Sequence, residues 1–188
     1  MRQGSTLAFE DTLASRLQAG HEEAADELVS LYADRLLRAA TLLLNDGRLA
    51  EDAVQETLMT AITRIGQFRG ESSLYSWLYT IMMRWCRRQQ RRRKIDSFLS
   101  LVPSEQLAHV ADKSVSIEAQ WESTEKGLRM SKAVGGLPLG YREVIVLFYY
   151  EEFSIPEISG LTGKPVGTVK SLLHRARQKL AQAFEEDE

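Results

Sequence analysis

The chain has 188 residues, enough for one domain or two small ones, and its single cysteine, Cys86, excludes an internal disulfide. A formal net charge of −2 conceals a segregated distribution, because residues 84–94 are strongly basic and residues 95–125 mainly acidic. Binding to a polyanion depends on the local patch that meets it, so the net charge does not exclude nucleic acid as a partner. No apolar stretch has the length of a signal peptide core or a membrane span, and we expect a cytoplasmic protein without membrane insertion.

Apolar residues at helical spacing predict a first long helix from about Glu22 to Leu44, ended by the Asn-Asp-Gly turn at residues 45–47. A second helix is expected from Leu49 to Ile65, with Gly66 ending it. The outer face of this second helix is polar. Such a face is either merely solvated or docks a protein, and periodicity alone leaves both alternatives open. Its residues are Asp52, Gln55 and Glu56.

A loop at residues 68–73 precedes a third predicted helix, from Leu74 to about Lys94, which begins with aromatic residues and ends in arginines. Aromatic rings can stack on unpaired bases while arginines hold the phosphates, and such a surface favours separated strands over a duplex. The alternative is that the aromatic rings belong to the core and the arginines form a solvated face. The aromatic residues concerned are Trp77, Tyr79 and Trp85.

Residues 95–125 show no sustained period, contain Pro103 and are acidic, so we expect a mostly extended, flexible linker. Helical spacing returns from about Trp121 to Val134 and, after a break at residues 135–138, from Leu139 to Tyr150. No segment shows strand alternation between hairpin turns. The sequence therefore predicts an all-α fold of two small helical domains, at residues 1–94 and 123–188, joined by a linker at 95–122.

The segment from Ser154 to Leu180 predicts a helix-turn-helix. Ser154 followed by Glu157 is a capping-box pattern, and Gly163 with Pro165 separates two helices. In the second of these helices one stripe is apolar and the opposite face is basic and polar. A recognition helix has this chemistry, although an ordinary amphipathic helix with a solvated face is the alternative. The polar face carries Lys170, Ser171, His174, Arg175 and Gln178.

The arrangements that an enzyme needs are missing from the sequence. His21, His109 and His174 are scattered, and Cys86 has neither a partner thiol nor an evident base. There is no phosphate-binding glycine loop and no metal-ligand spacing. We therefore expect no catalytic residues, no cofactor and no metal. A stand-alone helix-turn-helix regulator would need its own dimer interface or sensor domain, and a nucleic-acid enzyme would need clustered carboxylates beside the basic surface.

Three motifs in order resemble the extracytoplasmic-function sigma factors of bacterial RNA polymerase. Residues 52–56, Asp-Ala-Val-Gln-Glu, resemble the core-polymerase-binding segment of that family. Residues 68–73, followed by Trp77-Leu78-Tyr79, resemble its promoter-melting segment. Leu137-Pro138 with residues 165–171 resembles its upstream-element reader. The resemblance covers Glu22 to about Ala183 and implies a sigma domain 2 and a sigma domain 4, and a protein that catalyses nothing itself.

The resemblance implies a role for each candidate residue. Core RNA polymerase would be bound through Asp52, Gln55 and Glu56. The second partner is promoter DNA, as duplex and as the melted non-template strand. Minus-ten DNA would be contacted by Arg69, Ser72, Ser73, Trp77, Tyr79, Arg84 and Arg88. The minus-thirty-five element would be contacted by Thr168, Lys170, Ser171, His174 and Arg175.

Some positions depart from the family pattern, and the resemblance also bears on control. Arg84 and Arg88 stand where many relatives carry Asn and Asp, and Leu172 replaces a common basic residue. Asn both donates and accepts hydrogen bonds whereas Arg only donates, so the minus-ten base preference is open. Sigma factors of this type are commonly held inactive by an anti-sigma protein. Such a partner is one expectation for this chain, and control by expression level alone is the alternative.

Overall fold

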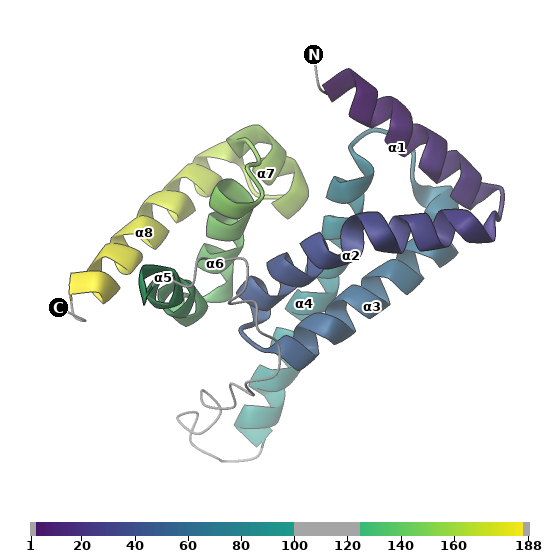
Figure 1. Cartoon of the computed structure of the whole chain (residues 1–188). Helices are drawn as coiled ribbons and strands as arrows, with labels where there is room; N and C mark the ends of the chain where they lie inside the picture. The colour runs from purple at the N-terminus through teal and green to yellow at the C-terminus, as the bar shows by residue number, and fades with distance from the viewer. Residues whose placement is uncertain (1–2, 100–124, 186–188) are drawn as a thin grey trace. The chain divides into compact units, whose positions relative to one another are not determined.

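The computed structural model of the protein describes residues 3–99 and 125–185, and all regular elements within these ranges are helical (Figure 1). The predicted all-α class is confirmed for the residues described. They form two compact units. The first unit extends to Leu37 and continues from Glu51 through the described residues of the next helices, and the second takes Arg38–Ala50 with the C-terminal helices.

The first unit contains an N-terminal helix that the sequence analysis did not predict. The predicted helix from Glu22 to Leu44 is confirmed with the same bounds, while the next begins slightly before its predicted start and continues into a 3₁₀ turn at Ile65–Gln67. The helices are α1 (Gln3–Gln18), α2 (Glu22–Leu44), α3 (Gly47–Arg64) and α4 (Leu74–Leu99).

Helix α4 continues beyond its predicted end at Lys94, so residues 95–99 are helical where a mostly extended linker was expected. The remainder of the predicted linker, and the start of the predicted helix at Trp121, lie outside the described residues. The core of the first unit is formed by apolar side chains of α1 to α4. Its fully buried members include Leu13, Leu28, Leu36, Leu74, Leu78, Tyr79 and Met82.

The second unit is built around α8, which packs against α5, α6 and α7 (Figure 1). The predicted helix from Leu139 to Tyr150 is present, but it is regular only to Ile145 and continues as a π-helical turn at Val146–Tyr150. The helices are α5 (Glu125–Gly136), α6 (Leu139–Ile145), α7 (Ile155–Thr162) and α8 (Val166–Glu185).

Candidate DNA-binding and docking surfaces

Helix α7 begins and ends where its sequence signals predict. The Glu157 amide donates to Ser154 Oγ at 3.5 Å, and the Ser154 amide donates to a Glu157 carboxylate oxygen at 2.8 Å, which completes the capping box. Gly163 follows with φ of 68°, a left-handed conformation that glycine adopts without steric cost. The turn is then fixed by Ser159, whose hydroxyl donates to the carbonyl of Lys164 at 2.6 Å. The helix-turn-helix prediction is confirmed at these positions.

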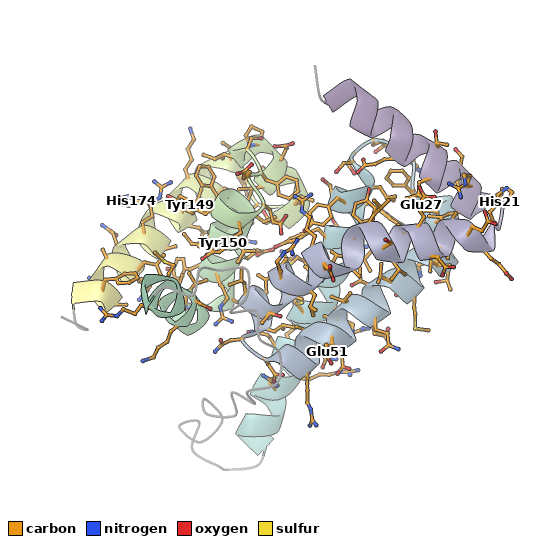
Figure 2. All side chains as sticks on the ribbon, in the orientation of Figure 1. His21, Glu27, Glu51, Tyr149, Tyr150 and His174 are labelled. Atoms are coloured by element: carbon orange, nitrogen blue, oxygen red, sulfur yellow. The ribbon has the colours of Figure 1, made fainter. Side chains whose placement is uncertain are left out.

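Helix α8 has two faces of opposite chemistry. Val169, Leu173 and Ala176 are buried against the rest of the second unit. The predicted minus-thirty-five residues are all exposed on this helix, and Figure 2 labels His174 among them. The exposed face therefore presents two cationic side chains, an imidazole and two hydroxyls, although the Ser171 hydroxyl donates within the helix to the Thr168 carbonyl at 2.9 Å. These exposed residues are Thr168, Lys170, Ser171, His174 and Arg175.

Two charged residues of α6 are buried in the second unit and are paired there. The Arg142 guanidinium is buried and donates to the carbonyls of Gly135, Leu137 and Leu43. Burial lowers the pKa of Arg142 to about 10, so the side chain is still cationic at neutral pH. Its neighbour Glu143 is 2% exposed and pairs with Lys164. No separate sequence signal marked these roles, because both residues lie on a helix whose buried face is otherwise apolar.

Helix α3 presents the predicted docking residues to solvent. Asp52, Gln55 and Glu56 are all exposed, while Ala53, Val54, Leu58 and Ala61 of the same helix are buried. Two large apolar side chains that the sequence analysis did not single out, Met59 and Ile62, are also exposed on this helix. Met59 follows Asp52 by seven residues and Ile62 follows Gln55 by seven, which places them on the same side of the helix, and this was the signal available in the sequence.

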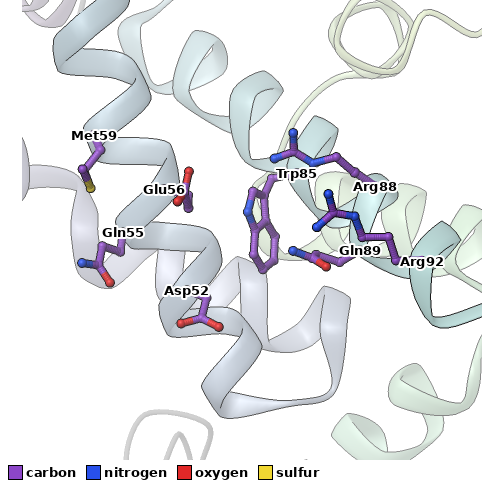
Figure 3. Close-up of a pocket in the computed structure, with 8 residues that line it drawn as sticks. All are labelled: Asp52, Gln55, Glu56, Met59, Trp85, Arg88, Gln89 and Arg92. Atoms are coloured by element: carbon purple, nitrogen blue, oxygen red, sulfur yellow. The ribbon is translucent and has the colours of Figure 1, made fainter. Parts of the chain in front are cut away.

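The acidic residues of α3 and the arginines of α4 line a common groove of about 380 Å³ (Figure 3). In Figure 3 Asp52 and Glu56 of α3 lie across from Trp85, Arg88 and Arg92 of α4. Gln89 completes the α4 side. In the sequence the acidic face and the arginine cluster are separate features. Their association could not be predicted, since it depends on how the two helices pack.

A second groove, of about 270 Å³, continues along the same two helices. Glu56, Trp85 and Arg88 line both grooves. Trp77 and Arg84, two predicted minus-ten residues, line the second groove only. Arg84 and Arg88 are exposed, whereas Trp77 is partly buried, with its ring centroid 5.5 Å from that of Phe68. The second groove therefore joins an aromatic surface to two exposed cations.

The aromatic residues of α4 divide between core and surface. Tyr79 is 0% exposed and Trp85 is 8% exposed, so both belong to the core as the alternative interpretation held. A stacking role for Tyr79 would require its ring to leave the core. Aromatic residues at helical spacing cannot be assigned to core or surface from the sequence alone, because both uses give the same pattern.

The loop before α4 exposes two of the predicted minus-ten residues, Arg69 and Ser72. Between them Gly70 has φ of 70°, a conformation that other residues rarely adopt. Ser73 has a different position: its hydroxyl accepts a hydrogen bond from the Ser76 amide at 3.1 Å and so caps the start of α4. The loop thus offers a cation and a hydroxyl to solvent, while Ser73 is engaged by its own helix.

Within residues 3–99 and 125–185, histidine, cysteine and acidic side chains form no cluster that could hold a metal ion. None of the described helices combines the length and hydrophobicity needed to cross a bilayer.

Comparisons with known proteins match both halves of the chain. The family model for Sigma-70 region 2 matches residues 28–95, and that for Sigma-70 region 4 matches residues 128–180. The ECF RNA polymerase sigma factor SigW of Bacillus subtilis is 30% identical over 88% of this chain and 91% of its own length. The RNA polymerase sigma-H factor of Pseudomonas aeruginosa is 29% identical over 96% of both chains.

A solved structure with a similar fold is that of the sigma factor RpoE of Bartonella quintana in complex with the anti-sigma factor NepR. The two chains superimpose with a TM-score of 0.67 and 30% sequence identity, covering 87% of this chain and 98% of the other.

Proposed function

The chain belongs to the extracytoplasmic-function sigma factors, which direct RNA polymerase to specific promoters at transcription initiation, and on this premise we propose which of its surfaces performs each step. Core polymerase docks on α3 through Asp52, Gln55 and Glu56. Exposed Met59 and Ile62 beside them support this assignment, because apolar side chains within a polar rim are typical of protein interfaces. The protein contributes binding, and polymerase contributes the catalysis.

Promoter melting is assigned to the loop before α4 and to the second groove. Arg69 and Ser72 are exposed in the loop, and Arg84 and Arg88 lie beside Trp77 in the groove. A surface that binds unpaired bases better than paired ones shifts the equilibrium towards separated strands, since a ligand moves an equilibrium only by its differential affinity. Tyr79 is left out of this surface because its ring is buried.

Recognition of the minus-thirty-five element is assigned to α8. The observation that carries the proposal is the exposure of Thr168, Lys170, Ser171, His174 and Arg175 on a capped helix-turn-helix whose apolar face is buried. Cationic side chains bind phosphates, and hydroxyl, imidazole and guanidinium groups hydrogen-bond base edges in the major groove. This division lets polymerase fix the distance between the two promoter elements.

The proposal is tested by run-off transcription with core RNA polymerase on a library of genomic fragments. We expect transcripts from a small set of fragments that share two short elements at fixed spacing. Transcripts that do not require this protein, or a set without a common element, would contradict it. A stand-alone regulator would instead footprint duplex DNA without polymerase, and a nucleic-acid enzyme would turn over nucleic acid in the presence of metal.

Two further assignments belong to the same proposal. The protein acts in the cytoplasm, where polymerase and promoter DNA are found. An anti-sigma protein covers the α3 docking face, by analogy with the complex of RpoE and NepR. Affinity capture from cells before and after stress tests this control. Recovery of polymerase subunits alone under every condition, with activity following protein abundance, would favour control by expression level instead.

A further inference from the structure

Helix α1 is hydrogen-bonded to both ends of the segment that carries the loop before α4. At one end, Gln18 Nε2 donates to the carbonyls of Ile65 and Phe68, at 3.2 and 3.4 Å. At the other end, a carboxylate oxygen of Glu10 accepts a hydrogen bond from the Leu74 amide at 3.1 Å. The exposed residues of the loop, Arg69 to Ser72, lie between these anchors.

Glu10 is an unusual residue at this place, because it is only 5% exposed. Burial of a carboxylate is costly unless its oxygens accept hydrogen bonds. Both carboxylate oxygens of Glu10 accept a hydrogen bond. One accepts from the Leu74 amide, and the other accepts from the Tyr32 hydroxyl at 2.9 Å. Burial and the adjacent Glu10 carboxylate raise the pKa of Tyr32, so its hydroxyl stays protonated and continues to donate at neutral pH.

The Glu10 carboxylate also lies at the N-terminus of α4, where backbone amides without an intrahelical partner favour negative charge. Ser73 caps the same helix by accepting from the Ser76 amide. The start of α4 is therefore fixed twice, once from its own chain and once from α1. Tyr32 extends the network, since its ring stacks on that of Tyr75 with centroids 6.0 Å apart.

We infer that Glu10 and Gln18 are positioning residues that hold the promoter-melting loop in the conformation that captures an unpaired base. They touch the ends of the loop and not the DNA. The inference rests on the proposed function of the loop. A loop whose ends are already fixed loses less conformational entropy when it binds a strand, so the network contributes to opening through pre-organisation.

The test measures promoter opening by holoenzyme, from the fluorescence of 2-aminopurine placed in the minus-ten non-template strand of a promoter found by run-off transcription. Glu10→Ala and Gln18→Ala should each slow opening about tenfold, as expected for loss of a hydrogen bond to a charged group or of two neutral ones. Glu10→Gln keeps an acceptor oxygen and should restore most of the rate. Affinity for core polymerase should not change.

The matched control is Arg16→Ala. Arg16 lies on the same helix, but its side chain pairs with Glu27 of α2 at 2.5 Å and does not contact the described loop residues 68–73 through a hydrogen bond. This variant should open promoters at the wild-type rate. A template with a pre-melted minus-ten region should restore transcription by Glu10→Ala and Gln18→Ala, because strand separation then no longer depends on the loop. A general loss of folding would not be restored in this way.

The outcomes separate the inference from the proposal beneath it. If Arg69→Ala slows opening while Glu10→Ala and Gln18→Ala open at the wild-type rate, the inference is wrong and the role of the loop stands. If Arg69→Ala also opens normally, the role of the loop is wrong and the inference fails with it. If Glu10→Ala does not fold, the opening rate measured with Gln18→Ala tests the inference by itself. A parallel fall in core affinity, or a defect that the pre-melted template does not relieve, overturns the inference.

Discussion

The Lys164 ammonium lies 3.0 Å from a carboxylate oxygen of Glu143 and joins the turn of the helix-turn-helix to α6. Glu143 is almost fully buried, whereas Lys164 is partly exposed. Lys164 stands directly after Gly163, so this ion pair connects the turn that precedes α8 to helix α6. The turn that leads into the proposed DNA-reading helix is thus held in part by a residue outside that helix.

Replacing Lys164 by Met should lower the free energy of unfolding by about 1.5–3 kcal/mol, because a buried carboxylate loses a charged hydrogen-bond donor. Circular dichroism during urea denaturation measures this change. Lys132→Met, at an exposed position of α5, is the matched control and should unfold as the wild type does. Equal stabilities of the two variants would show that the ion pair contributes nothing to the fold.

Substitution of Asp52 and Glu56 by Arg should abolish association with core polymerase and leave helicity and unfolding unchanged. Both side chains are exposed, and exposed charges contribute little to stability. Co-purification with core and circular dichroism make the two measurements. The control, Asp26→Arg on exposed α2 surface, should retain core binding. If the double variant still binds core as tightly as wild type, α3 is not the docking face.

Lys170→Ala and Arg175→Ala should retain core binding and reduce transcription through the minus-thirty-five element. If the residue makes a bidentate base contact, its replacement should cost about 1–3 kcal/mol of DNA-binding free energy and relax the preference at one base pair. A phosphate contact should instead weaken all promoters alike. Run-off transcription on a library randomised in that element distinguishes these two outcomes. Lys179 is also exposed on α8, and Lys179→Ala is the control. If Lys179→Ala reduced transcription as much as Arg175→Ala does, the assigned residues would not be specific for the minus-thirty-five element.

Arg84→Asn should change base preference at one position of the minus-ten element more than it changes overall activity. The structure exposes Arg84 in the groove that also contains Trp77 and Arg88. Asn both donates and accepts hydrogen bonds, whereas Arg only donates, so a base contact would change its partner. Selection from a randomised minus-ten library measures the preference, with exposed Arg91→Asn as control. Identical preferences of wild type and Arg84→Asn would exclude Arg84 from base recognition.

The sequence predicted those features that local signals determine. The bounds of α2 follow from helical spacing and the turn after Leu44, and the start of α7 follows from Ser154 and Glu157. Helix α1 was not predicted, because the charged Glu10 occupies a position of the buried stripe that Leu13, Ala14 and Leu17 continue, and its partner Leu74 is distant in the sequence. Long-range pairing is not encoded at any fixed spacing.

For the candidate surfaces too, features within one helix could be predicted and features that depend on packing between helices could not. The exposed face of α8 was predicted residue by residue, since a single helix determines which side chains lie opposite Val169 and Leu173. The groove that joins Asp52 to Arg88 was not predicted, because it requires the packing of two helices. The burial of Tyr79 could not be predicted either, since an aromatic ring at a helical position suits both core and surface.

The central claim is that this protein recognises promoters as a subunit of polymerase and not alone. Its reading face is small, and the two DNA-binding surfaces act together only when polymerase holds both. Fluorescence anisotropy of a labelled promoter duplex tests this directly, at several salt concentrations, with and without core polymerase. We predict weak, strongly salt-dependent binding by the free protein and tight, sequence-specific binding by the holoenzyme. Tight, sequence-specific binding by the purified protein alone at physiological salt would contradict the claim.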